Sequence, residues 1–215
     1  MIYFNEEKQA YAFEIPNYIA KVEDDVWANY AGTDKWDIID GEFVDVTESP
    51  EYLEKHLAEA KSAKYNEANS KAKIYLESGD ALYEFEEGKH IEATDGNIAK
   101  MTAYALAYLT GQLKPEDTVV WNTKEDETVE LTQEQIVEIL NGLGVVQARV
   151  WSVQFPTYVA QIDEATTVEE VEAIIINYAE LTLQLEEQEK ETLEEMNVEV
   201  KVAGRIMTKR VKGKV

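Results

Sequence analysis

The chain has 215 residues, with 44 Asp or Glu against 20 Lys or Arg, and its formal net charge is −24. Because 45% of the residues are hydrophobic, this acidity belongs to a folded surface and not to a disordered tract. The charge argues against binding to duplex nucleic acid, and the absence of cysteine excludes disulfides, thiolate zinc sites and a cysteine nucleophile.

Residues 1–48 are predicted to form a small β-rich module. Apolar residues on both sides of a polar turn indicate a first hairpin, whose second strand ends at Pro16. A short helical turn is expected over residues 24–30. The Asp40-Gly41 pair between two apolar runs then predicts a second hairpin, because this dipeptide suits the tightest hairpin turns.

Residues 49–79 are predicted to form a long connector helix. Ser49 is expected to be its N-cap, Pro50 occupies the first helical position, and Gly79 ends it. Its apolar residues are small and widely spaced, which favours a connector or a helix packed closely on another chain: Leu53, Leu57, Ala60, Ala68, Ala72 and Leu76.

Residues 80–196 are predicted to form a mainly helical domain that contains two hairpins. The hairpins are expected over residues 82–93 and 119–131, with a helix over residues 98–110 between them. Gly111 follows that helix at the position that favours left-handed backbone. Asp95 and Asn97 are interpreted as its turn and N-cap.

Two capping boxes predict the later helices of this domain. Thr132 with Gln135 opens the first helix, which Pro156 is expected to kink or divide. Thr167 with Glu170 opens the second, predicted to continue through Leu185 and then to project as an acidic helix. Together these elements predict the α+β class, with a small N-terminal β module, a connector helix and a helical second domain.

The last segment, residues 197–215, reverses the charge of the chain. From Val198 onward six basic residues face one acid, which gives +5 and leaves −29 for residues 1–197. The alternation of apolar and basic residues predicts a hairpin that docks on an acidic protein surface, such as another copy of this chain. A solvated tail that keeps the acidic chain soluble is the alternative. The residues expected to make the contact are Lys201, Arg205, Lys209, Arg210 and Lys212.

No catalytic, cofactor or metal site is predicted. The chain has two histidines, His56 and His90, and neither belongs to a zinc-binding pattern. Residues 95–97 match only a fragment of a calcium-binding loop, and acidic pairs such as Glu86-Glu87 lie on expected hairpin tips. The chain is therefore predicted not to be an enzyme.

The aromatic residues suggest two clusters. In the helical domain, Trp121, Trp151, Phe155 and Tyr158 are expected to face one another in the core. In the N-terminal module, Trp27 and Trp36 accompany three tyrosines, and the module is too small to bury them all. They are either packed against one another or form an exposed patch for a protein or sugar, so both tryptophans are candidate partner-binding residues.

Four motifs carry a resemblance: FEEGKHIEATDGNI at residues 85–98, WNTKED at 121–126, VQARVW at 146–151 and ATTVEEV at 165–171. In these motifs the stretch from Leu76 to about Tyr178 resembles an uncharacterised domain family of phage and prophage tail proteins. The N-terminal module, with YAFEIP at residues 11–16, Trp27 and DGEFV at 40–44, looks like tail fibre assembly and tail accessory proteins.

The resemblance implies a non-enzymatic phage tail protein that acts through contacts with other tail proteins. It implies a virion component of the fibre, the baseplate or the fibre attachment, made in the host cytoplasm, and a homo-oligomer is expected. The alternatives are an assembly chaperone that the virion does not retain, a receptor-binding adhesin and a glycan-cleaving tail enzyme. No signal peptide and no membrane span are predicted from the sequence.

Overall fold

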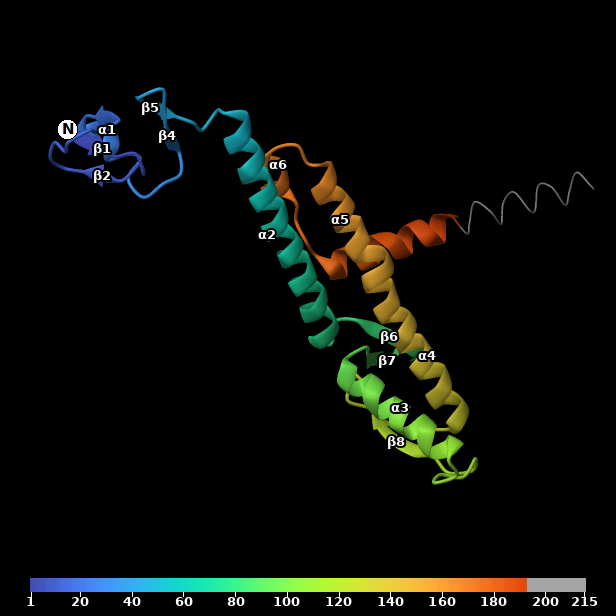
Figure 1. The fold of residues 1–215 in the computed structure, drawn as a ribbon. Coiled ribbons are helices and arrows are strands. Elements are labelled where there is room, and N and C mark those ends of the chain that lie inside the picture. Colours follow the sequence, from blue (N-terminus) through green and yellow to red (C-terminus); the bar gives the residue numbers. More distant parts are fainter. Residues whose placement is uncertain (193–215) are drawn as a thin grey trace, which may run out of the picture. The chain divides into compact units, whose positions relative to one another are not determined.

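The computed structural model describes residues 1–192, and its helices and small antiparallel strand pairs confirm the α+β class (Figure 1). The chain divides into two compact units. The first holds residues 1–63 and 165–172, and the second holds residues 64–164 and the described residues from 173 onward. The basic residues expected to bind an acidic partner, Lys201, Arg205, Lys209, Arg210 and Lys212, lie outside the described residues.

The first unit contains a three-stranded antiparallel sheet in the order β2-β1-β3, a short helix and a second hairpin. The predicted hairpin at Asp40-Gly41 is confirmed, and both residues have the positive φ (51° and 83°) that its turn requires. The expected strand end at Pro16 is wrong, because β2 stops at Tyr11 and a third strand follows. The elements are β1 (Ile2–Phe4), β2 (Ala10–Tyr11), β3 (Ala20–Val22), α1 (Asp24–Trp27), β4 (Trp36–Ile39) and β5 (Glu42–Asp45).

The first unit is built around the ring of Phe4, which is fully buried. The rings of Trp27, Trp36 and Phe43 surround it, with centroids 5.2, 5.1 and 5.8 Å away. Trp27 and Trp36 also pack edge to face against each other. Aromatic packing of this kind supplies much of the core of so small a module.

Helix α2 (Pro50–Glu77) starts in the first unit and ends in the second. The Ser49 hydroxyl accepts from the Tyr52 N–H at 3.2 Å, which confirms the predicted N-cap. Gly79 follows the helix with a φ of +82°, as predicted. Ala68, Ala72 and Leu76 are buried in the core of the second unit, so the small residues of this helix do meet a core there.

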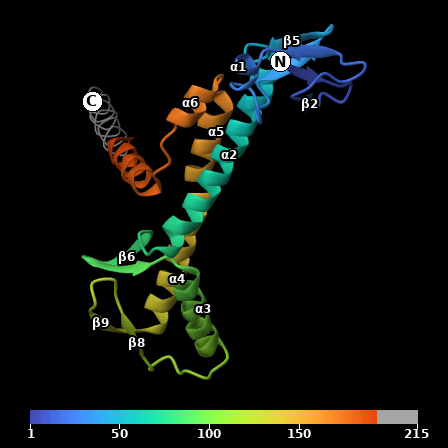
Figure 2. The ribbon, with the colours of Figure 1, turned by 90° about the vertical axis from the view of Figure 1, so that its left-hand side faces the viewer.

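The described part of the second unit contains the end of α2, two β-hairpins and five helical segments. Helix α3 packs against α4 in both ribbon views (Figures 1 and 2). The Thr132–Gln135 capping box is confirmed at the start of α4. The elements are β6 (Leu82–Glu86), β7 (Lys89–Glu92), α3 (Asp95–Leu109), β8 (Val119–Asn122), β9 (Thr128–Leu131), α4 (Gln133–Arg149), the π-helix η1 (Val150–Gln154), α5 (Phe155–Glu164) and helical residues 178–192, while most of α6 (Val168–Ala173) belongs to the first unit.

Two local predictions for the second unit need correction. Thr94, and not Asp95 or Asn97, is the N-cap of α3, because its side chain accepts from the Asn97 N–H. Trp121 packs edge to face on Tyr104 and not on Trp151, whose side chain is 37% exposed. Of the four aromatics predicted to meet, Trp151 and Phe155 pack on each other, whereas Trp121 packs on Tyr104 and Tyr158 packs on Tyr178.

The helix predicted from Thr167 through Leu185 is interrupted. Its capping box with Glu170 is present, but α6 ends at Ala173 and residues 174–177 are not helical. The Nζ atoms of Lys64 and Lys71, about two turns apart on α2, donate to the Ile174 and Ile176 carbonyls at 3.3 and 3.2 Å. These side chains from a distant helix satisfy the backbone of the break, which local sequence does not reveal.

A new helix starts after the break, capped by Asn177. The Asn177 Oδ1 atom accepts from the Glu180 N–H at 3.3 Å. The backbone of Asn177 is held in turn by the Tyr158 hydroxyl, which accepts from its N–H at 2.9 Å and donates to its carbonyl at 3.0 Å. A single phenol from α5 thus fixes the position where the helix of residues 178–192 begins.

Candidate functional site

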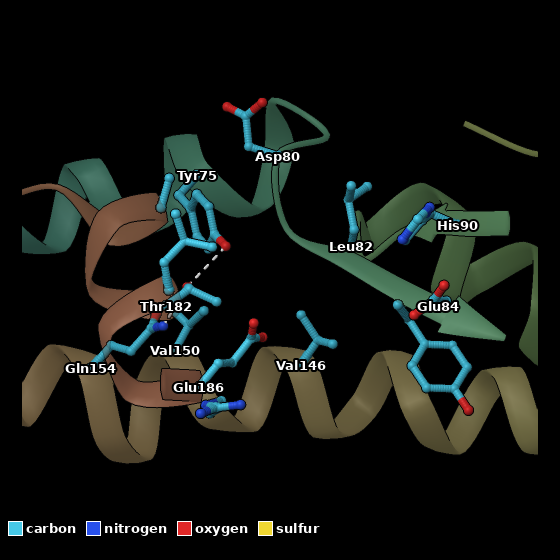
Figure 3. A pocket seen from close by; sticks show the side chains of 14 residues that line it. Tyr75, Asp80, Leu82, Glu84, His90, Val146, Val150, Gln154, Thr182 and Glu186 are labelled. Carbon is cyan, nitrogen blue, oxygen red and sulfur yellow. Dashed lines mark hydrogen bonds between the residues drawn. The ribbon is translucent and has the colours of Figure 1, made fainter. Parts of the chain in front are cut away.

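The second unit contains a cavity of about 570 Å³ (Figure 3). Its walls come from the end of α2, the β6–β7 hairpin, the α4–η1 helix and the helix of residues 178–192. The apolar part of the lining is made by Leu82, Val146, Val150, Ala179 and Leu183. A cavity of this size with mainly apolar walls and a few polar groups is typical of binding sites.

The π-helix η1 determines which side chains of its segment face inward. Val150 and Gln154 are buried and line the cavity, whereas Trp151 and Val153 between them are exposed. The wide turn lies directly before Pro156, whose missing N–H cannot complete a regular helical bond. Pro156 was expected to kink or divide the helix, and the structure instead places a π-turn ahead of it. Single π-turns inside helices are frequently found at functional sites.

At one end of the cavity, three side chains meet at the hydroxyl of Thr182. This hydroxyl donates its one proton to the Tyr178 carbonyl at 2.8 Å. It therefore accepts from the other two groups, the Gln154 Nε2 atom at 2.6 Å and the Tyr75 hydroxyl at 3.1 Å (Figure 3). The network ties α2 and η1 to the helix of residues 178–192.

The Gln154 side chain leaves one polar atom unpaired. Gln154 is 1% exposed, and its Oε1 atom has no hydrogen-bond partner among the described residues. A buried acceptor without a donor costs about 1–3 kcal/mol of folding free energy.

The rim of the cavity is acidic. Three carboxylates line it, those of Asp80, Glu84 and Glu186, against one guanidinium, that of Arg149. Arg149 is already paired, since its Nη2 atom lies 2.9 Å from Glu189 Oε1. Glu84 accepts from the Gly88 N–H at 2.8 Å, whereas half-buried Glu186 has no hydrogen-bond or ion-pair partner among residues 1–192.

His90 also lines the cavity, but its bonds lead to the other hairpin. Its N–H donates to Glu125 Oε2 at 3.0 Å, and its ring Nδ1 lies 2.8 Å from Glu125 Oε1. The backbone N–H bond first, and the ring bond with it, lowers the pKa of the Glu125 carboxyl to about 2. His90 and Glu125 thus join the β6–β7 hairpin to the turn of β8–β9, which is a structural role.

His56, in the first unit, is a packing histidine. Its ring lies on Tyr52 with a centroid separation of 4.0 Å, and its Nε2 atom lies 3.2 Å from Asp34 Oδ2. Within the described part of the chain, no three His, Asp or Glu side chains are arranged to hold a metal ion.

The candidate partner-binding residues Trp27 and Trp36 lie half-buried in the aromatic cluster around Phe4. A shallow hollow of about 550 Å³ opens elsewhere in the first unit, beside Tyr18, Lys21 and Phe43. Neither tryptophan lines it. The structure therefore places both indoles in packing contacts and not in this hollow.

A charge-free strip of side chains is exposed on the α4–η1 helix, which we call the α4 face. It consists of Val137, Asn141, Gly144, Val145, Ala148 and Trp151, which recur at helical spacing. Val145 is 67% exposed and Val137 is 44% exposed. Apolar surface of this kind on a helix marks contacts with a partner.

The α4–η1–α5 stretch is also notable for its hydropathy. Residues Gln133–Glu164 form one helical stretch that is long and apolar enough to cross a membrane by length and composition. The core helix of a soluble protein passes the same test, and this stretch carries the buried core residues Ile136, Ile139 and Leu143. Its hydropathy is therefore weak support for a membrane span.

Sequence reasoning missed the cavity, although a signal was available. Val146, Val150 and Gln154 follow one another at spacings of four along an apolar helical face. A glutamine on such a face is unusual, because a buried amide needs partners. That one polar residue in the stripe predicts either a polar network or a ligand.

Comparisons with protein-family models, with curated proteins and with solved structures found no match to this chain.

Proposed function

We propose that this protein is a non-enzymatic component or accessory of a phage tail that acts through protein–protein contacts. The observation that carries the proposal is the α4 face, an exposed, uncharged strip on a chain that is otherwise strongly acidic. Folded proteins keep such strips for partners, because burying them removes apolar surface from water. The resemblance of residues 76–178 to tail proteins supplies the biological setting.

The bonding of the titratable groups supports an assembly role over a catalytic one. Around the cavity, Glu84 is bonded to Gly88, His90 to Glu125 and Arg149 to Glu189. A general acid or base needs a free proton position that faces a substrate, whereas each of these three groups is hydrogen-bonded to another residue of the protein. The partners proposed for the α4 face are a second copy of the chain or another tail protein.

Substitution within the α4 face tests the contact. Val145→Glu places a charge at the centre of the strip, while Leu109→Glu is the matched control, since Leu109 is 82% exposed on α3 and outside the strip. The wild type and the control are expected to sediment as the same oligomer at micromolar concentration, and Val145→Glu as a smaller species. Equal masses for all three proteins would argue against the α4 face as a contact between copies.

Purified phage particles test the biological setting. A tail component is expected to be detected by mass spectrometry in particles that contain the other tail proteins. An assembly chaperone is expected in extracts with unassembled tail proteins and absent from the particles. Absence from both fractions contradicts the proposal.

A further inference from the structure

We propose that the free edge of strand β6 binds the C-terminal segment of the same chain, residues 198–215, through an added strand formed by residues 198–202. The proposal uses residues outside the α4 face and does not rest on the assembly role. Three observations carry it: the unpaired backbone groups of β6, the sequence and position of the C-terminal segment, and the opposite charges of the two surfaces.

The outer edge of β7, the partner strand of β6, is already occupied. The His90 N–H donates to Glu125 Oε2 at 3.0 Å, and the His90 carbonyl accepts from the Lys124 N–H at 2.9 Å. The Glu92 carbonyl accepts from the Asn97 side chain at 3.1 Å. These bonds of His90 and Glu92 run away from β6, so both residues occupy non-hydrogen-bonded positions of the hairpin.

The outer edge of β6 is free. In the register of the hairpin, Leu82 lies opposite Glu92 and Glu84 lies opposite His90. Because these are non-hydrogen-bonded pairs, the N–H and carbonyl groups of Leu82 and Glu84 point away from β7 as well. None of these four groups has a hydrogen-bond partner among residues 1–192. A strand edge with free N–H and carbonyl groups is a template for one more strand.

The C-terminal segment has the sequence of a strand. Residues 198–202 read VEVKV, in which valine alternates with Glu199 and Lys201. Valine favours strands, and the alternation gives the strand one apolar side and one polar side. The cavity beside β6 offers an apolar surface for the valines, since Leu82, Val146 and Leu183 line it (Figure 3).

The segment begins within reach of β6. Glu186, on the helix of residues 178–192, lines the same cavity as Leu82 and Glu84. The helix rises about 9 Å from Glu186 to residue 192, and residues 193–197 can span about 17 Å. The chain is therefore long enough to bring residues 198–202 beside β6. A tethered segment competes at a high effective concentration, which favours the segment of the same chain over that of a second copy.

The charges of the two surfaces agree with this pairing. Residues 198–215 contain six basic residues and one acid. The cavity beside β6 is lined by the carboxylates of Asp80, Glu84 and Glu186, and its one guanidinium, that of Arg149, is paired with Glu189. Exposed ion pairs are individually weak, so the backbone bonds determine where the strand lies and the charges favour a basic segment there.

The test measures amide hydrogen exchange in the full chain. In the wild type, the amides of Leu82 and Glu84 are expected to be protected by bonds to the added strand. The double substitution Val200→Pro and Lys201→Pro removes two successive N–H groups, and one of them must face β6 because neighbouring N–H groups of a strand point to opposite sides. Exchange at Leu82 and Glu84 should then be faster by about tenfold, the effect of losing one or two backbone hydrogen bonds.

The matched control is the double substitution Lys212→Pro and Gly213→Pro, which also adds two prolines and removes one lysine but lies outside residues 198–202. It should exchange as the wild type does. The amide of Ile91, opposite Tyr83 in a hydrogen-bonded pair inside the hairpin, should be unchanged in every variant and reports that the fold is intact. Unprotected Leu82 and Glu84 amides in the wild type, or equal acceleration by both double substitutions, overturns the proposal.

A second arm identifies the chain that supplies the strand. Because the chain has no cysteine, Lys201→Cys carries a nitroxide label at a single site. A labelled ¹⁵N chain, diluted into unlabelled wild type, is expected to lose the amide signals of Leu82 and Glu84. Loss of these signals only when the nitroxide and the ¹⁵N label are on different chains would assign the strand to a second copy and overturn the intramolecular contact. Protection of the two amides without any signal loss would assign the edge to another segment and also overturn it. Neither arm depends on oligomer mass, so the assembly role is judged separately.

Discussion

The side-chain amide of Gln154 donates to the hydroxyl of Thr182 at 2.6 Å, and this bond joins η1 to the helix of residues 178–192. The same hydroxyl accepts from Tyr75 on α2. Three helical segments that are far apart in the chain therefore share one oxygen atom. Loss of that atom leaves the buried Gln154 amide and the half-buried Tyr75 hydroxyl without this acceptor.

Thr182→Val is expected to destabilise the second unit by about 2–4 kcal/mol, because valine keeps the shape of threonine but removes the shared acceptor. Thr192→Val is the control, since Thr192 also donates to the carbonyl four residues before it but is exposed. Urea unfolding followed by circular dichroism measures both. Similar losses of free energy in the two variants would contradict the network.

Gly142→Ala is expected to destabilise the protein by about 1–3 kcal/mol, the usual cost of overpacking a core. A Cβ atom at this position of α4 would lie 2.2 Å from the Tyr83 ring. Gly144→Ala on the same helix is the control, because a Cβ there meets nothing within 4 Å and alanine is the better helix former. Thermal unfolding should show a lower melting temperature for Gly142→Ala and a higher one for Gly144→Ala. A rise in melting temperature for both variants would contradict the contact between Gly142 and Tyr83.

Glu125→Gln is expected to reduce the amount by which the free energy of unfolding falls as the solution is made acidic. The folded pKa of Glu125 is about 2, below its ordinary value of 4.5, because the ionised form accepts from His90. A depressed carboxyl pKa gives stability that is present above pH 4.5 and is lost as the pH falls towards 2.

The measurement for this variant is the free energy of unfolding between pH 5 and pH 2.5, with pH steps chosen on both sides of the ordinary pKa of 4.5. Glu127→Gln removes an acid from the same turn and is the control, expected to keep the slope of the wild type. If both variants change the slope equally, the His90–Glu125 bonds are not its source.

Tyr158→Phe is expected to cost more stability than Tyr178→Phe, at about 2–3 against about 1 kcal/mol. The Tyr158 hydroxyl satisfies both the N–H and the carbonyl of Asn177 where the chain is not helical. Within residues 1–192, the Tyr178 hydroxyl is bonded to the Ala68 carbonyl inside α2 alone. Chemical unfolding measures the loss of unfolding free energy in each variant. A larger loss in Tyr178→Phe would mean that other groups satisfy the Asn177 backbone when the Tyr158 hydroxyl is absent.

Features that depend on neighbouring residues could be predicted from the sequence. The Asp40-Gly41 turn, the Ser49 cap, the Thr132–Gln135 capping box and the end of α2 at Gly79 each depend on groups within a few positions. Their physical cause is local, since side chains satisfy the first free N–H groups of a helix or glycine adopts a positive φ.

Features that depend on distant residues could not be predicted in this way. In the break at residues 174–177, the carbonyls of Ile174 and Ile176 accept from Lys64 and Lys71, which lie more than one hundred positions away. The cavity likewise forms only when α2, β6, η1 and the helix of residues 178–192 come together. The periodicity of the sequence indicated one continuous helix there, and tertiary contacts override it.

The inclusion of residues 165–172 in the first unit has a consequence for how the protein is made. Residues 1–63 leave the ribosome first, but the last piece of their unit follows about one hundred residues later, roughly 5–20 s at typical rates of synthesis. For that interval the nascent N-terminal unit lacks the segment around Val171, whose side chain is fully buried in the finished fold. A variant that slows synthesis between residues 63 and 165 therefore lengthens the time for which the nascent first unit lacks this segment.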